Sequence, residues 1–316
     1  PCKCTGLVSW RTPEILKNLP KRLIVNKLAK GKFYAPNGTS FVLKSKKPAY
    51  VLDRTGLDRF LFEQAVKAGA EMKTEHFETF RYNNGHVEIK TNKGVYKTKI
   101  LIGADGANST VAQKANLPMP KNIFVGLQTT APGDFEQHAE LWFGKTTAPN
   151  FFAWVVPENE EIARIGLATP TSPKLYYERF LETRLNHNGL KPDVAGVIRF
   201  GIMKDTVADR VMLVGDAACQ VKPFSGGGIT YGLIVAQICA VAVEKSFEEN
   251  KFDYNLFKQN YDLEWKKKLV PGINKGMMMR KIFYLLPDSQ MNLSFKIISL
   301  FRHNILNRLD FDLLSG

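Results

Sequence analysis

One segment constrains the fold more than any other: a short apolar run that ends in Gly-Asp and leads to a glycine-rich helix start. Residues 211–214 are apolar and typical of a buried strand, and Gly215 and Asp216 follow directly. Ten residues later, a triplet of glycines opens a long apolar stretch at Ile229. Open α/β sheets bind ligands beyond the carboxyl ends of their strands, and helix N-termini attract anions. The segment therefore predicts an α/β fold with a ligand site at Asp216, Gly227, Gly228 and Ile229.

Two further segments follow the same pattern. Residues 99–103 are typical of an apolar strand, and Asp105 and Gly106 come after them in a turn before a short helix. Arg54 stands at the end of another predicted strand, just before a helix. A planar guanidinium at such a place can hold a pyrophosphate through two hydrogen bonds. We therefore expect Arg54, Asp105 and Gly106 to belong to the same site.

The rest of the pattern predicts strands, a meander and a mostly helical end. Strands are expected at 32–34, 41–43, 50–52 and 210–214, and an antiparallel meander at 71–104. Further β segments are expected within 122–169, including 140–143, 151–156 and 163–167. Helices are expected from an N-cap at Thr55 to Gly69, over 172–185, and from Gly228 onward with breaks near Pro271-Gly272 and Pro287. Asp58 completes a capping-box pattern with Thr55. The alternation indicates an α/β fold with an inserted antiparallel β-sheet.

Composition and charge narrow the class of protein. Of the 316 residues, 44% are hydrophobic and 23% are charged, which excludes a disordered chain, a collagen-like chain and a coiled-coil rod. The net charge is +14, and it gathers at the two ends: residues 1–50 hold eleven Lys and Arg against one acid, and residues 261–308 hold nine against three. Basic ends favour an anionic partner, whether membrane headgroups, a phosphorylated substrate or nucleic acid, over a role in solubility alone.

Cysteine use and one uncharged stretch bear on the compartment. Four scattered cysteines form no disulfide framework and no zinc motif, so we expect a reducing, cytoplasmic environment and no metal. Residues 223–243 carry no charge over 21 positions, but their first half is glycine-rich. We therefore predict a loop leading into a buried helix there, and not a transmembrane segment.

Taken together, these segments resemble the flavin monooxygenase-like group with the p-hydroxybenzoate hydroxylase fold, and within it the geranylgeranyl reductases. Residues 51–71 (VLDRTGLDRFLFEQAVKAGAE) match the arginine-containing motif of that branch, GADGANS its D-G motif and VGDAACQVKPFSGGG its G-D motif. Residues 149–157 fit the pattern P-x-x-Y-x-W-x-F-P, from which Phe152 and Val156 depart. The stretch that contains Cys4, Thr5 and Gly6 looks like the cysteine-containing loop beside the flavin of archaeal reductases.

The resemblance implies an FAD cofactor and a domain layout. It assigns to FAD the residues Cys4, Thr5, Gly6, Arg54, Asp105, Gly106, Asp216, Gly227, Gly228 and Ile229. Residues 1–11, 46–118 and 203–260 would form a Rossmann-like FAD-binding domain, 12–45 and 119–202 a β-rich substrate domain, and 261–316 a helical C-terminal region. The family opens with a strand, G-x-G-x-x-G and a helix, which this sequence lacks, so we expect that the first βαβ unit, roughly 30 or more residues, is missing.

The implied reaction is the saturation of geranylgeranyl chains in archaeal ether lipids. An isolated alkene would take a hydride from the flavin on one carbon and a proton on the other, and Cys4 is the candidate proton donor, with an inert buried thiol as the alternative. Phe152, Trp154 and Val156 share one face of a strand and are candidates to line the substrate tunnel, or else belong to the sheet core. The electron donor stays open between NAD(P)H, ferredoxin and others. The other hypotheses are a monooxygenase or halogenase on this fold and a non-catalytic basic membrane-binding protein; no nucleic acid partner is expected.

The sequence of the C-terminal region indicates where in the cell the protein works. Apolar residues between 291 and 309 fall largely along one side of a helix: Met291, Leu293, Phe295, Ile298, Phe301, Ile305 and Leu309. Lysines and arginines lie upstream and between them, including Lys266, Lys267 and Lys268. An apolar stripe flanked by cations is typical of a helix that lies in a bilayer interface. We therefore expect peripheral binding to an anionic membrane surface, at the inner face of the cell membrane.

Overall fold

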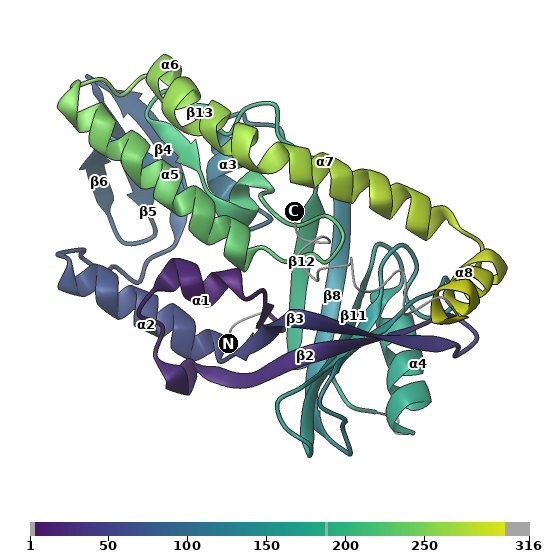
Figure 1. The fold of residues 1–316 in the computed structure, drawn as a ribbon. Coiled ribbons are helices and arrows are strands. Elements are labelled where there is room, and N and C mark those ends of the chain that lie inside the picture. The colour runs from purple at the N-terminus through teal and green to yellow at the C-terminus, as the bar shows by residue number, and fades with distance from the viewer. Residues whose placement is uncertain (1–3, 187–188, 301–316) are drawn as a thin grey trace. The chain divides into compact units, whose positions relative to one another are not determined.

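The computed structural model describes residues 4–186 and 189–300, which divide into two compact units (Figure 1). The first unit holds the residues up to Phe62, Ile123–Ile198 and the part from Met277. The second holds Glu63–Asn122 and Arg199–Gly276. The mixed α/β architecture and the helical C-terminal part agree with the expected fold class, and the division into a cofactor domain and a substrate domain stays a prediction.

The first unit is built on an eight-stranded sheet in the order β1-β3-β2-β9-β10-β11-β8-β12. Its strands are β1 (Leu7–Val8), β2 (Ile24–Tyr34), β3 (Ser40–Leu52), β8 (Asn122–Pro132), β9 (Ala139–Trp142), β10 (Ala153–Pro157), β11 (Ile162–Thr169) and β12 (Val194–Phe200). Its helical elements are α1 (Arg11–Leu16), η1 (Lys21–Leu23), α4 (Pro173–Leu185) and α8 (Asp288–Leu300). Strand β2 pairs with β9 in parallel, and β8, β9, β10 and β11 pair antiparallel.

The predicted short strands at 41–43 and 50–52 are parts of one long strand. In β3, Lys44 pairs with Lys30 and Ala49 pairs with Leu28, so the residues between 44 and 49 stand outside the ladder as an irregularity. Pro48 lies in that interval, where its missing N–H costs no ladder bond. The turn at Pro36-Asn37-Gly38 is confirmed, since the Ala35 N–H donates to the Thr39 carbonyl.

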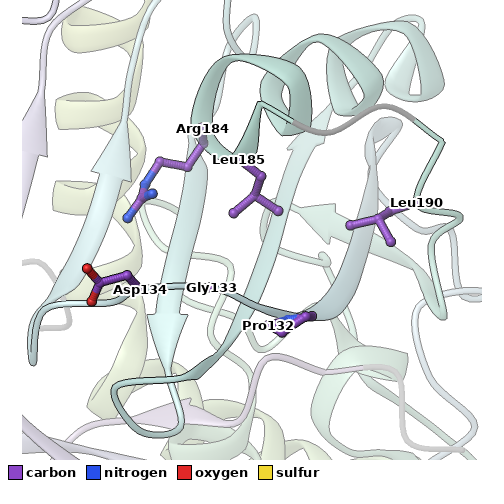
Figure 2. Close-up of a pocket in the computed structure, with 6 residues that line it drawn as sticks. All are labelled: Pro132, Gly133, Asp134, Arg184, Leu185 and Leu190. Carbon is purple, nitrogen blue, oxygen red and sulfur yellow. The ribbon is translucent and has the colours of Figure 1, made fainter.

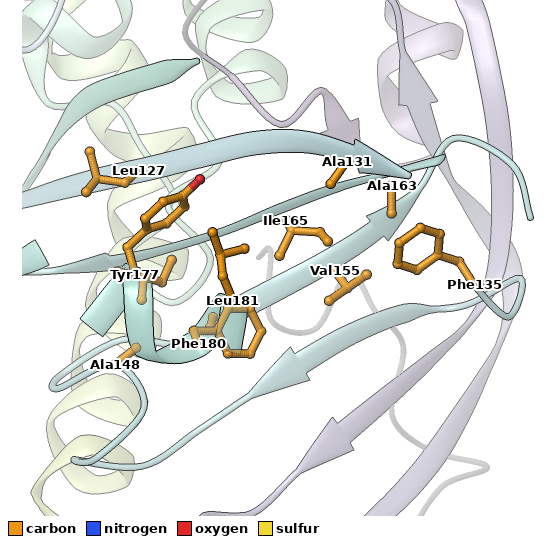
Figure 3. Packing of buried hydrophobic residues seen from close by; sticks show 12 residues of the cluster. Leu127, Ala131, Phe135, Ala148, Val155, Ala163, Ile165, Tyr177, Phe180 and Leu181 are labelled. Atoms are coloured by element: carbon orange, nitrogen blue, oxygen red, sulfur yellow. The ribbon is translucent and has the colours of Figure 1, made fainter. Parts of the chain in front are cut away.

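Helix α4 covers one face of this sheet and makes the main core of the unit (Figure 3). Tyr177, Phe180 and Leu181 of α4 pack with Val155 of β10 and Ile165 of β11, all of them buried. A separate cluster contains Val156 with Leu28, Val51 and Ala139. Neighbouring residues of β10 therefore serve two clusters, as side chains that alternate between the faces of a strand must.

The second unit contains two three-stranded sheets. Strands β4 (Phe77–Asn83), β5 (His86–Thr91) and β6 (Val95–Thr98) form the predicted meander, and β13 (Val207–Ala208), β14 (Val211–Leu213) and β7 (Leu101–Gly103) form the other sheet in the order β13-β14-β7. The helical elements are α3 (Thr110–Lys114), η2 (Gly215–Ala218), α5 (Ile229–Glu248), α6 (Tyr254–Phe257) and η3 (Lys258–Asp262). Residues 101–103 are not the last strand of the meander, because they pair in parallel with β14 instead.

Helices α2 (Arg54–Lys67) and α7 (Leu263–Leu285) correct two local expectations. The Asp53 carboxylate, and not Thr55, accepts the Gly56 N–H at the start of α2 at 2.9 Å. Helix α7 runs unbroken through Pro271, while the expected break near Pro287 is confirmed. Leu269 and Ile273 are buried on either side of the proline, so packing holds both turns although one backbone bond is lost.

The structure bears on two expectations about membrane contact. In the part of the chain that is described, α5 alone has the length and apolar composition to cross a membrane, and a core helix of a soluble protein has the same features. The apolar side expected on the C-terminal helix is wrong in part, because Met291 and Phe295 of α8 are buried. The Phe295 ring packs against Phe41 and Phe143 of the same unit. Phe301, Ile305 and Leu309 lie outside the described residues.

Candidate active site

The two predicted aspartates of the second unit follow neighbouring parallel strands. Val211 pairs with Leu101 and Leu213 with Gly103, and the ladder continues as the Val214 N–H donates to the Gly103 carbonyl. Asp105 and Asp216 therefore both stand beyond the carboxyl edge of this sheet. That edge is where open α/β sheets bind their ligands.

Side chains from further along the chain hold the turn that carries Asp216. The Gln220 amide oxygen accepts the Gly215 N–H at 2.7 Å, and its nitrogen donates to the Tyr261 hydroxyl at 3.1 Å. Burial raises the pKa of Tyr261, so the phenol keeps its proton and donates to the Leu213 carbonyl. Gly215 has φ of 69°, which favours glycine. The Asp216 turn is thus fixed before any ligand binds.

Asp216 lies against the start of helix α5. A Cβ placed on Gly228 would stand 2.4 Å from Asp216 Oδ1, closer than a Cβ atom approaches a non-bonded neighbour in real structures. Gly228 is the N-cap residue of α5, so the carboxylate lies close to the positive end of a 20-residue helix. A Cβ on Gly227 would make only ordinary contacts, the nearest at 3.5 Å from Ser225. Of the two glycines, Gly228 is the one whose missing side chain the packing requires.

Asp105 has a local task in the structure. Its two carboxylate oxygens accept the Ser109 hydroxyl at 2.6 Å and the Val111 N–H at 3.1 Å. Ser109 in turn accepts the Ala112 N–H and caps α3. Gly106 has φ of 83°, the conformation that lets the chain turn between strand and helix. Any ligand bond to Asp105 would therefore use its remaining lone pairs.

The first unit brings together the loop of Cys4, Thr5 and Gly6 with Arg54. The Gly6 N–H donates to Cys4 Sγ at 3.3 Å, and the Gly6 carbonyl accepts the Leu52 N–H. Gly6 has φ of 73°. A Cβ there would lie 3.2 Å from Arg54 Cγ, so Gly6 stands next to the aliphatic part of the Arg54 side chain. Arg54 donates to Asp58 at 2.7 Å, one helical turn along α2. The guanidinium is thus oriented by a carboxylate on its own helix.

Comparison with known proteins identifies the family. No family model matches the sequence. The chain is 30% identical to digeranylgeranylglycerophospholipid reductase 1 of Methanothermobacter thermautotrophicus, in an alignment that covers 92% of this chain and 79% of that protein. The chain belongs to the digeranylgeranylglycerophospholipid reductase family. A family member from Methanocaldococcus jannaschii is 29% identical over 89% of this chain and 74% of its own length.

Solved structures agree on the fold of this reductase-family chain. A geranylgeranyl bacteriochlorophyll reductase-like protein from Thermoplasma acidophilum superposes with a TM-score of 0.88 at 22% identity, over all of this chain and 85% of that one. The p-nitrophenol 4-monooxygenase of Pseudomonas putida superposes at 0.73 with 18% identity, over all of this chain and 89% of its own. A solved halogenase of similar fold holds FAD. The expected fold class is thereby confirmed, and the protein is an oxidoreductase by family.

Of the predicted tunnel residues of this family member, Trp154 and Val156 lie in β10 and Phe152 precedes it, and two of the three are buried. The Phe152 and Trp154 rings meet edge to face at 6.1 Å, and Trp154 packs against the cluster that contains Val156. Val156 is 1% exposed and Phe152 6%, so Trp154 alone of the three is partly accessible. Their role toward a substrate stays a prediction.

A pocket of about 290 Å³ lies elsewhere in the first unit (Figure 2). It is lined by Pro132, Gly133, Asp134, Arg184, Leu185 and Leu190. Arg184 makes two hydrogen bonds to the buried Glu140 carboxylate, which raises the pKa of Arg184. Because the charge of Arg184 is already balanced by Glu140, Arg184 is not available to bind an anion, and we assign this pocket no role in the reaction.

Sequence reasoning missed three residues that support the site: Gln128, Arg164 and Gly166. Arg164 donates to the Thr5 carbonyl at 2.6 Å and to the Leu52 carbonyl at 2.9 Å. The available signal was Gly166, an isolated glycine inside a predicted strand, which indicates a close approach of another group.

Proposed function

We propose that the protein is an FAD-dependent reductase that saturates carbon–carbon double bonds in the geranylgeranyl chains of archaeal ether lipids. The observation that carries the proposal is the 30% identity to a named digeranylgeranylglycerophospholipid reductase over 92% of the chain. The pair of aspartates beyond the ends of β7 and β14 supports it, because such an edge suits a dinucleotide.

The residues present fit FAD. In the second unit, Asp216 would accept hydrogen bonds from the ribityl hydroxyls, and the start of α5 at Gly228 and Ile229 would face the electron-rich edge of the flavin ring. In the first unit, we assign to the same cofactor Cys4, Thr5, Gly6 and Arg54, the last as a pyrophosphate ligand. Bound FAD would supply the reducing equivalents.

The chain itself must orient the lipid and place a proton. A geranylgeranyl alkene has no carbonyl to polarise it, so the proton has to be held close to one carbon of the bond. We propose that Cys4 Sγ carries this proton, since the Gly6 N–H orients the sulfur. Trp154, partly accessible and beside Phe152, would contact the chain of the lipid.

Flavin content tests this proposal without a substrate. The protein, expressed from its whole gene, should purify yellow with bound FAD, and Asp216→Ala should retain less of it after gel filtration. Retention by the variant equal to that of the parent would remove Asp216 from the cofactor site. A colourless protein that binds no added FAD would contradict the proposal and favour the non-catalytic alternative. In a separate assay with added lipid, hydroxylated or halogenated products would favour the monooxygenase or halogenase alternative.

We further propose that the protein works at an anionic membrane surface, through a face that differs from the expected one. Along α7, Met278, Ile282 and Leu285 are exposed at helical spacing, and along α8 the exposed set is Leu293, Ile297 and Leu300. Lys281 and Lys296 are exposed among them. Each cation near an anionic surface contributes about 1 kcal/mol to the free energy of membrane binding. Exposed apolar side chains strengthen binding by inserting into the bilayer interface.

Vesicle binding tests the membrane proposal. Lys266 is unsuitable for it, because its ammonium is bound to Asp262 and to the Lys204 carbonyl. Lys281→Glu with Lys296→Glu should weaken binding to phosphatidylglycerol vesicles, and so should Ile282→Ser with Ile297→Ser. Binding should fall with added salt and be weak on phosphatidylcholine. Binding indifferent to salt and lipid charge would refute the proposal, and a concentration-dependent dimer lost in these variants would assign the face to a second copy.

A further inference from the structure

Three residues on neighbouring strands form a straight row across the first unit's sheet. Trp154 of β10 is opposite Gly166 of β11, and Gly166 is opposite Gln128 of β8. Adjacent strands lie about 4.8 Å apart, so Trp154 and Gln128 start about 10 Å from each other. The indole Nε1 nevertheless donates to Gln128 Oε1 at 3.0 Å. The Trp154 side chain therefore crosses the intervening strand.

Gly166 is what makes this crossing possible. A Cβ on Gly166 would lie 2.5 Å from the Leu127 carbonyl oxygen of β8, 2.8 Å from Trp154 Cζ2 and 2.9 Å from Gln128 Cβ. Glycine in the interior of a strand weakens it, unless another group needs the space. Here the space is filled by the indole ring.

The same Gln128 oxygen also holds the loop that carries Cys4. Thr5 Oγ1 donates to Gln128 Oε1 at 2.7 Å, across 123 positions of sequence. Gln128 is only 4% exposed, so both donors meet the oxygen away from bulk water. An amide oxygen has two lone pairs and can accept both bonds.

Arg164 adds a second attachment at the backbone. It stands on β11 two residues before Gly166, hence on the same face of the strand. Its Nη1 donates to the Thr5 carbonyl at 2.6 Å, and Glu158 holds its Nε at 2.6 Å. The loop is thus bound through the side chain and the carbonyl of one residue, Thr5.

We propose that Gln128 is a positioning residue, whose single amide oxygen sets the Cys4 loop and the Trp154 indole in a fixed relation. Gln128 acts through these two neighbours and needs no contact with lipid or cofactor. The purpose of this fixed relation rests on the proposed function, in which the Cys4 thiol and the Trp154 indole contact the same substrate chain.

The accessibility of the Cys4 thiol tests this directly. In a Cys2→Ser background, iodoacetamide should report on Cys4, because Cys219 and Cys239 are buried and burial raises the pKa of each to about 12. Gln128→Leu, which removes the acceptor, and Gly166→Ala, which displaces the indole, should each raise the alkylation rate of Cys4 at least fivefold. Gln128→Glu keeps the acceptor and should stay within twofold of the parent.

A matched control and a cycle of variants complete the test. Gly126→Ala changes another glycine of the same sheet whose Cβ would meet nothing closer than 3.8 Å, and it should leave the rate unchanged. Thr5→Val should raise the rate, and adding it to Gln128→Leu should have no further effect. Rates for Gln128→Leu and Thr5→Val equal to the parent's, or effects that multiply in the double variant, would overturn the proposal.

Two readouts keep the outcomes separate. A variant that unfolds also exposes Cys219 and Cys239, so alkylation at those sites identifies it, and Thr5→Val then decides the question. Labelling needs neither lipid nor FAD, so a protein that fails as a reductase can still pass this test. Where turnover is measured, Gln128→Leu should lower kcat and Gln128→Glu should restore most of it.

Discussion

A buried carboxylate in the second unit offers a sharp test of the packing behind the Asp216 turn. Asp262 is fully buried and accepts four hydrogen bonds. The N–H and the hydroxyl of Thr206 supply two of them, and the ammonium groups of Lys258 and Lys266 supply the others. Asp262→Asn keeps the shape and the bonds from Thr206, but it replaces the oxygen that faces two cations with an amide N–H₂.

The expected loss follows from the burial of the pair. Breaking a buried ion pair by removing one partner costs about 3–5 kcal/mol. The side chains of Lys258 and Lys266 are 22% and 18% exposed, so water compensates part of the loss and we expect about 3 kcal/mol. Urea unfolding followed by tryptophan fluorescence measures it, because Trp265 donates to Thr206 within the same network. Asp205→Asn, at a more exposed carboxylate bound by Lys258, is the control and should cost about 1 kcal/mol.

The pH dependence of stability provides a second test of Asp262. Burial alone would raise the pKa of Asp262, but the bonds from Lys258, Lys266 and Thr206 outweigh it and the pKa lies below the ordinary value. A lowered folded-state pKa means that the contribution is complete above the unfolded-state pKa of about 3.9 and is lost as the pH falls toward the folded-state value. The stability difference between parent and Asp262→Asn should therefore be constant above about pH 5 and shrink below about pH 4. A loss under about 1 kcal/mol, or one that grows on acidification, would refute the reasoning.

Three further outcomes are expected. Gly228→Ala should push Asp216 aside and lower FAD retention, whereas Gly232→Ala, where a Cβ meets nothing within 4 Å, should retain FAD like the parent; equal retention by both would contradict the packing at Gly228. Phe295→Ala should destabilise the first unit by about 3–5 kcal/mol in urea unfolding, since its ring is 1% exposed, and a loss below about 1 kcal/mol would show that α8 is not docked. Trp154→Ala should lower turnover on geranylgeranyl lipids with FAD binding intact, and equal loss of both would mark Trp154 as core.

Much of the second unit's site was predictable, because it depends on local sequence. A strand, a carboxylate and a glycine lie next to one another along the chain at Asp105 and again at Asp216, and parallel pairing of two such strands brings their ends together. The support of the turn was not predictable, since Gln220 and Tyr261 are 41 positions apart and only tertiary packing joins them.

Three features of the chain show where local rules fail. Thr55 and Asp53 are both good caps, and the structure uses Asp53 because its carboxylate reaches the Gly56 N–H. Pro271 predicts a helix break, which packing on both sides overrides. The bond from Trp154 to Gln128 depends on which strands are neighbours, and no spacing along the sequence encodes that order.

The most direct measurement is the mass of the lipid product. Digeranylgeranylglycerophospholipid is incubated with the FAD-loaded protein and dithionite as the reductant, and the extracted lipid is analysed by mass spectrometry. We expect the mass to rise by two hydrogens for each double bond reduced, and we expect the rise to be absent without protein and reduced in the Cys4→Ala variant. A lipid of unchanged mass, with FAD bound and reduced in the same sample, would contradict the proposed function.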